Sequence, residues 1–204
     1  LWSGRPQTRG ENKDASKYLK PIREALAQKD FSKANELCKK MQGEYSQCYL
    51  PLGDVKLNQL YKGSRPNASY KYYRRSLCLD SALVNVSYMV NRVNYRREIF
   101  VSAPDSAMVI RLSADKPGMV ALDLDFDCQI DGYKVQPSGD MLSLSGAAPV
   151  NSYPVYYNPS DKPLYTMTTQ DGKTGIRFNA LAKAVADGGF VSVDDQGLHV
   201  RDAI

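Results

Sequence analysis

Apolar and polar residues alternate with a period of two through the segment 70–114, and short polar breaks interrupt the pattern. One alternating run covers residues 84–90, a two-residue break follows at Asn91 and Arg92, and a second run covers residues 93–101. Alternation on both sides of a short break predicts an antiparallel hairpin with one buried face. A third run over residues 109–114 makes a three-stranded meander, which is enough to nucleate a sheet.

A helical period replaces this alternation between residues 14 and 43. Apolar residues spaced three and four apart predict the inner faces of two short helices, which are Leu19, Ile22 and Leu26 in the first and Ala34, Leu37, Cys38 and Met41 in the second. Pro21 is expected in a first turn, Ser32 as the N-cap of the second helix, and Gly43 as its C-terminal stop. The segment 14–43 is therefore predicted to be a helical hairpin.

Further short alternating runs follow the meander and one precedes it. They predict strands over residues 55–60, 120–126, 141–145, 175–186, 190–193 and 198–200, with a long extended loop over residues 147–174. The predicted fold is all-β: one large, mostly antiparallel β-sandwich domain over residues 1–204, carrying the short N-terminal helical hairpin.

Three strings in the meander carry a family resemblance. YRRSLCLDSALVNVSYMV (73–90), YRREIFVSAPD (95–105) and VIRLSADKPG (109–118) resemble the N-terminal β-domain of glycoside hydrolase family 95. The strings LWSGRP at residues 1–6 and YLPLGD at residues 49–54 fit the same domain, and Cys78 departs from the family at a position that is usually polar. The resemblance implies a super-sandwich fold.

The same resemblance implies a function for a longer parent protein. The family contains α-L-fucosidases and α-L-galactosidases, in which an (α/α)₆ barrel C-terminal to the β-domain hydrolyses the glycosidic bond with inversion. That barrel is absent from residues 1–204, and no residue of this chain matches its catalytic positions. The chain is thus expected to be a non-catalytic fragment without a cofactor that packs against the barrel and borders its active site, in an extracytoplasmic bacterial protein. Specificity for α-L-galactosides stays open.

A second hypothesis is a carbohydrate-binding module. Aromatic rings on loops can stack on a sugar face, and the irregular stretch supplies Tyr153, Tyr156, Tyr157 and Tyr165. Packing of these tyrosines against the sandwich is the alternative.

The composition argues against nucleic-acid binding, membrane spanning and cysteine-based metal binding. The net charge of +5 is scattered, and the basic-aromatic string 71–75 is interpreted as a strand, so nucleic acid is not an expected partner. No run approaches the roughly 20 apolar residues of a membrane span. The four cysteines lack metal-site spacing and are expected to be buried free thiols, with disulfides left open; they are Cys38, Cys48, Cys78 and Cys128.

Candidate chemistry is sparse. Asp123, Asp125 and Asp127 alternate along one strand and so share a face about 6.5–7 Å apart, a spacing compatible with inverting glycosidases. Every carboxylate pair two residues apart on a strand meets this spacing, and a catalytic acid also needs a raised pKa, so we interpret the three as the solvent-facing side of a strand. A calcium loop is excluded because Cys128 and Lys134 stand where glycine and glutamate are required. The lone His199 has no nucleophile motif to partner it. Neither a catalytic residue nor a metal site is therefore predicted.

Overall fold

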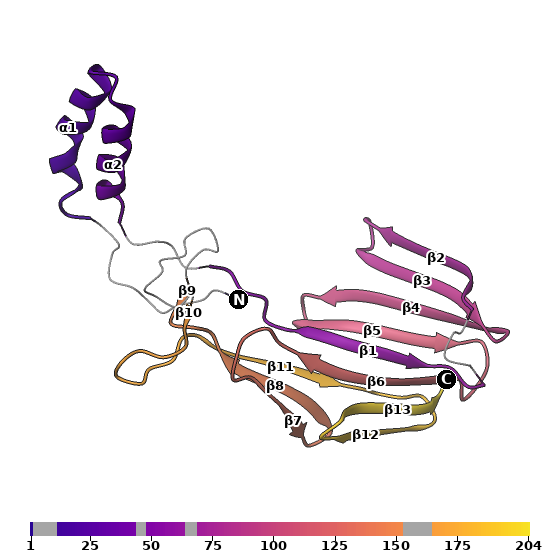
Figure 1. Ribbon diagram of the computed structural model, residues 1–204. Coiled ribbons are helices and arrows are strands. Elements are labelled where there is room, and N and C mark those ends of the chain that lie inside the picture. Colours follow the sequence, from indigo (N-terminus) through magenta and orange to yellow (C-terminus); the bar gives the residue numbers. More distant parts are fainter. Residues whose placement is uncertain (2–11, 44–47, 64–68, 153–164) are drawn as a thin grey trace. The chain divides into compact units, whose positions relative to one another are not determined.

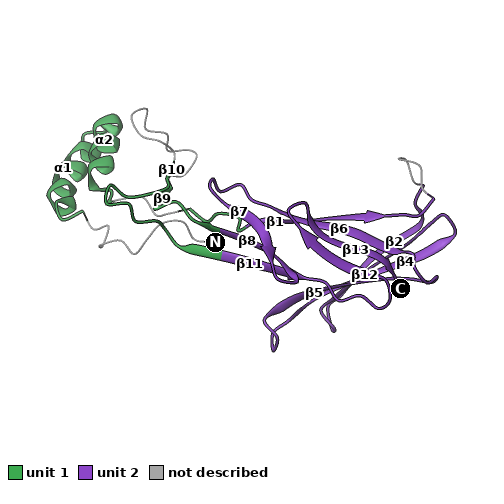
Figure 2. Cartoon of the chain, turned by 90° about the horizontal axis from the view of Figure 1, so that it is seen from below, with its two compact units in different colours: residues 1–52, 146–178 green, residues 53–145, 179–204 purple. Residues whose placement is uncertain are grey.

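The computed structural model describes residues 1, 12–43, 48–63, 69–152 and 165–204 (Figure 1). These fall into two compact units, each built from two separate stretches of chain (Figure 2). Unit 1 contains residues 1–52 and 146–178, and unit 2 contains residues 53–145 and 179–204. The expectation of a single domain stays a prediction.

The predicted helical hairpin is confirmed in unit 1. Helix α1 runs from Ala15 to Ala27 and helix α2 from Phe31 to Met41. The side chain of Asn12 closes the open end by donating hydrogen bonds to the carbonyl oxygens of Lys40 (2.7 Å) and Gln42 (3.1 Å). None of the helices in the described part of the chain is long and apolar enough to cross a membrane.

Three details of the hairpin differ from the prediction. Asp30, not Ser32, caps α2, because its carboxylate accepts a hydrogen bond from the Lys33 N–H at 3.0 Å. Pro21 lies inside α1, since the helix begins six residues before it. The C-cap of α2 is Gln42 in an extended conformation, so Gly43 does not form the stop.

The buried faces of the helices are narrower than predicted. Ile22, Ala25 and Ala34 are buried, whereas Leu19 and Leu26 are 43% and 48% exposed and Cys38 is also exposed. Small alanines on both helices allow a close approach, so the seam runs through them and rotates the larger leucines outwards.

The rest of unit 1 contains short strands. Strand β9 (Asn151–Ser152) pairs with β10 (Tyr165–Thr166), where the sequence predicted an extended loop over residues 147–174. The Ala148 N–H also donates to the Ile176 carbonyl at 2.8 Å. Gly175 is required beside this contact, because a Cβ there would lie 2.3 Å from the Ala148 carbonyl oxygen.

The predicted meander is confirmed in unit 2. Strands β2 (Lys71–Cys78), β3 (Leu83–Val90), β4 (Val93–Ser102) and β5 (Ala107–Ala114) form one antiparallel sheet in that order, here called the meander sheet. Asn91 and Arg92 both have positive φ angles, +53° and +62°, which suits the tight turn of a two-residue hairpin.

A second four-stranded antiparallel sheet also belongs to unit 2. Its order is β1 (Asp54–Leu60), β6 (Val120–Asp127), β13 (Gly197–Ala203) and β12 (Phe190–Asp194). A three-stranded sheet has the order β11 (Arg177–Lys183), β8 (Met141–Ala147) and β7 (Lys134–Ser138); residues 179–183 and 141–145 of its longer strands lie in unit 2. The sequence pattern did not predict β7.

The two four-stranded sheets form a sandwich. One buried cluster belongs to the meander sheet and contains Val86, Tyr88, Val90, Val93 and Tyr95. Tyr61, which directly follows β1, packs against this cluster. The described chain is therefore mostly antiparallel β-structure with one helical hairpin, which confirms the predicted fold class.

Candidate functional site

A groove of about 490 Å³ lies on the inner face of the meander sheet, within unit 2. Its polar lining consists of Tyr61, Tyr70, Tyr73, Tyr88, Arg75 and Arg97, and three aliphatic side chains complete it. The volume falls within the range of about 300–1,000 Å³ that is usual for ligand sites. Period-two alternation explains the lining, because directly paired residues of neighbouring strands share one face.

The tyrosine rings brace one another. Tyr88 stacks on Tyr95 with ring centroids 5.7 Å apart and on Tyr73 at 6.3 Å, and Tyr70 meets it edge-on at 5.4 Å. Tyr61 meets Tyr95 edge-on at 5.1 Å. Such offset and edge-to-face pairs stabilise aromatic clusters by about 0.5–1.5 kcal/mol per pair beyond their burial alone.

The phenol groups are linked by hydrogen bonds. The Tyr61 hydroxyl donates to the Tyr88 hydroxyl at 2.9 Å, and the Tyr88 hydroxyl donates to Gln59 Oε1 at 2.6 Å. Burial, followed by hydrogen bonds with Tyr88 and Tyr70, raises the pKa of Tyr61 far above its ordinary value. Burial likewise raises the pKa of Tyr95. Both shifts favour the neutral phenol, so neither Tyr61 nor Tyr95 is suited to act as a base.

The charged lining of the groove is entirely basic. Arg97 donates from Nη2 to Gln59 Oε1 at 3.1 Å, while its Nε is buried and finds no hydrogen-bond partner among the described residues. Arg75 lies in the same cross-strand row, two strands away, with Val86 between them. No carboxyl group lines the groove in the described part of the chain. The groove therefore favours a carboxylate or another anion.

A second polar cluster lies on the polar face of the other sheet of unit 2. His199 Nδ1 is 2.7 Å from Asp123 Oδ1, and His199 Nε2 is 3.1 Å from Asp194 Oδ1. Arg201 Nη2 also donates to Asp123 Oδ1, at 2.5 Å. Both ring nitrogens of His199 thus face carboxylates, and no hydroxyl or thiol nucleophile of the described chain is hydrogen-bonded to either.

The hydrogen bonds in this cluster favour the charged forms of its histidine and its two aspartates. The hydrogen bonds with Asp123 and Asp194 raise the pKa of His199. Burial opposes ionisation of Asp123, but the hydrogen bonds from His199 and Arg201 outweigh it and lower the pKa of Asp123. A backbone hydrogen bond from Gln196, and then His199, lower the pKa of Asp194. The cluster is an ion-pair network that ties β6, β12 and β13 together.

The aspartates of β6 therefore have unlike surroundings. Asp125 is exposed as predicted, but Asp123 is half-buried in the histidine network. Asp127 contacts Lys56 Nζ at 2.6 Å and accepts a hydrogen bond from Tyr133 at 3.1 Å. All three lie on the polar face of the strand, as predicted, but the alternation of one strand does not reveal the polar residues of its neighbour β13, so the contact of Asp123 with His199 was not predicted.

Comparison with known proteins agrees with this architecture. The family model described as "Glycosyl hydrolase family 65, N-terminal domain" matches residues 1–204. The chain belongs to this family. This chain is also 27% identical over 194 residues to "Alpha-L-fucosidase 2" of Arabidopsis thaliana. The alignment covers 94% of this chain and 22% of the relative. It therefore spans about a fifth of the length of this curated relative.

The resemblance to a glycoside hydrolase N-terminal β-domain is thus confirmed. The matching model bears the family number 65, whereas the meander strings resemble family 95. Three of the four tyrosines predicted to bind sugar in the N-terminal domain, Tyr153, Tyr156 and Tyr157, lie outside the described residues. Tyr165 lies in β10 and is 42% exposed. Sugar binding by these residues stays a prediction.

The groove was missed at the level of sequence. A signal for it was present: Arg97 interrupts an otherwise apolar series at the inward positions between Tyr95 and Ile99. The next residue, Glu98, faces the opposite surface. Glu98 contacts Arg96 at 2.8 Å and Arg111 of β5 at 3.8 Å, whereas Arg97 reaches Gln59 of β1.

The cysteines of the N-terminal domain differ in exposure. None of the four forms a disulfide; Cys128 is buried and Cys48 half-buried, but Cys38 and Cys78 are exposed, contrary to the expectation of buried thiols. The expectation was wrong for these two because α2 turns Cys38 away from the seam and β2, which holds Cys78, is exposed along its length. Among the described residues no three acidic, histidine or cysteine side chains are arranged to hold a metal ion.

Proposed function

We propose that the chain is a non-catalytic N-terminal domain of a glycoside hydrolase that removes terminal α-L-fucosyl residues from glycans. In this proposal it packs against the catalytic (α/α)₆ barrel of its parent chain and borders the active site. The whole-length family match and the fucosidase name of the relative support the class, and the meander strings support the sugar. α-L-Galactosidase is the alternative specificity.

One observation carries the non-catalytic role: the groove has four tyrosines and two arginines, and none of its described lining residues is a carboxyl. An inverting glycosidase needs two facing carboxyl groups, and its general acid needs a raised pKa. Asp123 and Asp127 have pKa values shifted the opposite way, downwards, by their hydrogen-bonding partners. Neither side chain is suited to donate a proton to a leaving group.

An activity comparison tests the proposal. The full-length parent should hydrolyse an aryl α-L-fucoside, and residues 1–204 alone should not. Hydrolysis by the purified domain that disappears in Asp123→Asn contradicts the non-catalytic role. A parent that prefers an aryl α-L-galactoside, or hydrolyses neither substrate, contradicts the proposed specificity.

A carbohydrate-binding role is the second candidate, because Tyr165 is 42% exposed on β10. Calorimetric titration with a fucosylated glycan should then give measurable heat that Tyr165→Ala reduces. The matched control is Tyr72→Ala, since Tyr72 is 79% exposed but lies in the other unit. Absence of heat, or equal loss in both variants, contradicts sugar binding at β10.

The proposed glycan-degrading role suits an extracytoplasmic bacterial protein. Cell fractionation of the native host tests this location: recovery of the parent with the cytoplasmic fraction contradicts it.

A further inference from the structure

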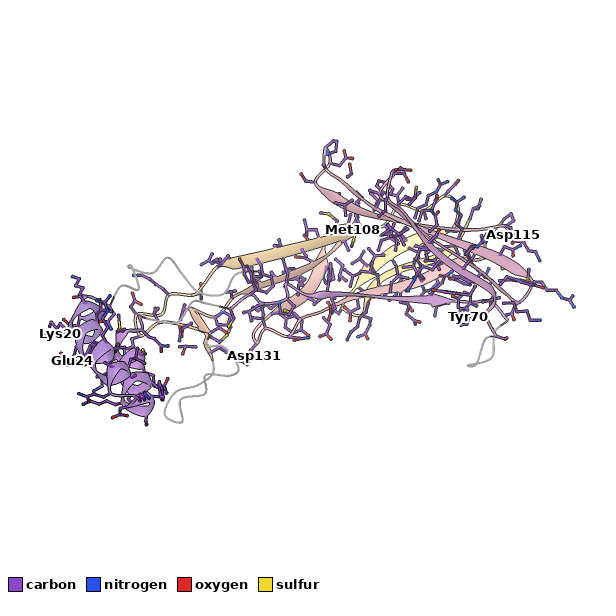
Figure 3. The ribbon with its side chains drawn as sticks, turned by 90° about the horizontal axis from the view of Figure 1, so that it is seen from above. Lys20, Glu24, Tyr70, Met108, Asp115 and Asp131 are labelled. Carbon is purple, nitrogen blue, oxygen red and sulfur yellow. The ribbon has the colours of Figure 1, made fainter. Side chains whose placement is uncertain are left out.

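The inner face of the meander sheet stays apolar well beyond the tyrosine cluster. Leu77, Val84, Ile99 and Ile110 lie in one cross-strand row, and Val101 pairs with Met108 two positions further along. Leu77 is 60% exposed, Val101 is 73% exposed and Met108 is 57% exposed. The six side chains of these two rows are called here the apolar face; they are Leu77, Val84, Ile99, Ile110, Val101 and Met108. In Figure 3 Met108 lies near one end of β5, and Asp115, which is not part of this face, lies just past the other end.

The opposite surface of the same strands is polar at the equivalent rows. Ser76, Asn85, Glu98 and Arg111 form one row there, and Arg96 contacts Glu98 at 2.8 Å. A half-buried antiparallel sheet has one polar surface in water and one apolar surface against a core. The apolar face thus has the composition of a covered surface, and a contiguous exposed apolar patch marks an interaction site.

Two arginines beside the apolar face indicate the chemistry of whatever covers it. Arg75 and Arg97 occupy the row next to Leu77, and the described residues offer Arg75 no polar partner. The Nε of Arg97 is buried and has no hydrogen-bond partner in the part of the chain that the structure describes. A buried arginine donor left unpaired is costly, so an occupant that adds a carboxylate is favoured over a purely apolar one.

We propose that a segment of the parent chain outside residues 1–204 covers the apolar face, contributing apolar side chains and at least one Asp or Glu that pairs with Arg75 and Arg97. This inference rests on the proposed function, in which the chain is part of a longer protein. The chain covers only 22% of the fucosidase relative, so a parent of that length has ample chain for the task.

Two other occupants fit less well. A second copy seated through the same face adds two more arginines and, among the described residues that line the groove, no carboxylate. A sugar in the groove leaves Leu77, Val101 and Met108 in water, because none of them lines it.

Thiol labelling in the full-length parent tests whether a segment covers the apolar face. Val101→Cys places a probe on the apolar face and Ser76→Cys places one on the polar surface, in a background whose other reactive cysteines, including Cys38 and Cys78, are serine. Relative to the denatured protein, Val101→Cys should react with a maleimide at least about tenfold more slowly, since labelling must await local opening. Ser76→Cys is the matched control: on the exposed polar surface of the same sheet it should be labelled in the native parent at close to the denatured rate.

Labelling of Val101→Cys in the native parent at the denatured rate overturns the proposal. Protection that vanishes on dilution, together with a dimer by size-exclusion chromatography, also overturns it, because the cover is then a second copy. Protection that persists at every dilution supports it.

A charge pair of variants tests the carboxylate. Arg75→Glu, in the row next to the apolar face, should speed labelling of Val101→Cys several-fold, because like charges then oppose the covering segment. Arg74→Glu is the matched control, since the adjacent Arg74 pairs with Ser87 on the polar surface. Equal effects of the two variants overturn the predicted carboxylate contact. Labelling does not depend on turnover, so these results are independent of whether the parent proves to be a fucosidase.

Discussion

At the scale of single residues, His199 links protonation to stability. It is the only histidine in the chain, and its imidazole lies between Asp123 and Asp194. Because those hydrogen bonds raise its pKa in the folded state, folding is favoured most below the unfolded pKa of about 6.5 and the contribution is lost as pH rises through the folded pKa. We expect an effect of about 1 kcal/mol, typical of a net hydrogen bond.

Urea unfolding between about pH 5 and pH 9 measures this effect. The urea concentration at the unfolding midpoint of the wild-type chain should decrease as the pH is raised from about 5 to about 9. The midpoint of His199→Gln should be lower than that of the wild type at about pH 5 and should decrease less as the pH rises. The lowered pKa values of Asp123 and Asp194 place their titration below this window, so they do not mimic the signal. A wild-type midpoint that is flat from acid to alkaline pH contradicts the network.

Adjacent glycines at the turn before β12 provide a second residue-level prediction. Gly188 and Gly189 both have positive φ, +69° and +64°. A Cβ at Gly189 would lie 2.0 Å from the Arg201 carbonyl oxygen, whereas at Gly188 the nearest atoms are side-chain carbons of Ile204 at 3.7 Å. Gly188→Ala should cost about 1–2 kcal/mol from backbone conformation, and Gly189→Ala distinctly more.

Thermal unfolding of the two variants checks that order. Equal losses of free energy of unfolding in Gly188→Ala and Gly189→Ala would mean that the close backbone approach to β13 is absent.

At the scale of elements, the cap of α2 can be tested directly. Asp30→Ala removes the acceptor of the Lys33 N–H and should destabilise the helix by about 1 kcal/mol. Ser32→Ala should have little effect, because Ser32 is exposed and inside the helix. Hydrogen exchange of the α2 amides measures both. A larger effect of Ser32→Ala than of Asp30→Ala contradicts the assignment.

The elements show how far sequence patterns reach. Strands with clean alternation, such as β3, β4 and β6, were predicted because each has one face against the core. The short strand β7, with the sequence KVQPS, was missed because it is half-exposed and contains a proline. The faces of the helices were misjudged because apolar spacing finds the largest side chains, whereas the seam is formed by Ala25 and Ala34.

Contacts between distant elements could not be predicted in the same way. His199 and Asp123 are 76 positions apart and meet only through the register of β13 on β6. Arg97 and Gln59 are 38 positions apart and meet between two sheets. Residue types suggested neither pair, because hydrogen-bonding partners depend on the strand order.

At the scale of the whole molecule, chain order and spatial grouping do not coincide. Unit 1 needs residues 146–178 as well as its N-terminal stretch, and unit 2 needs residues 179–204 to place β13 between β6 and β12. During synthesis on the ribosome, β6 therefore waits about 70 residues for its neighbour β13, which takes several seconds at about 5–20 residues per second. A nascent chain stalled before that point presents β6 with one open side, and this interval is when a chaperone would be needed.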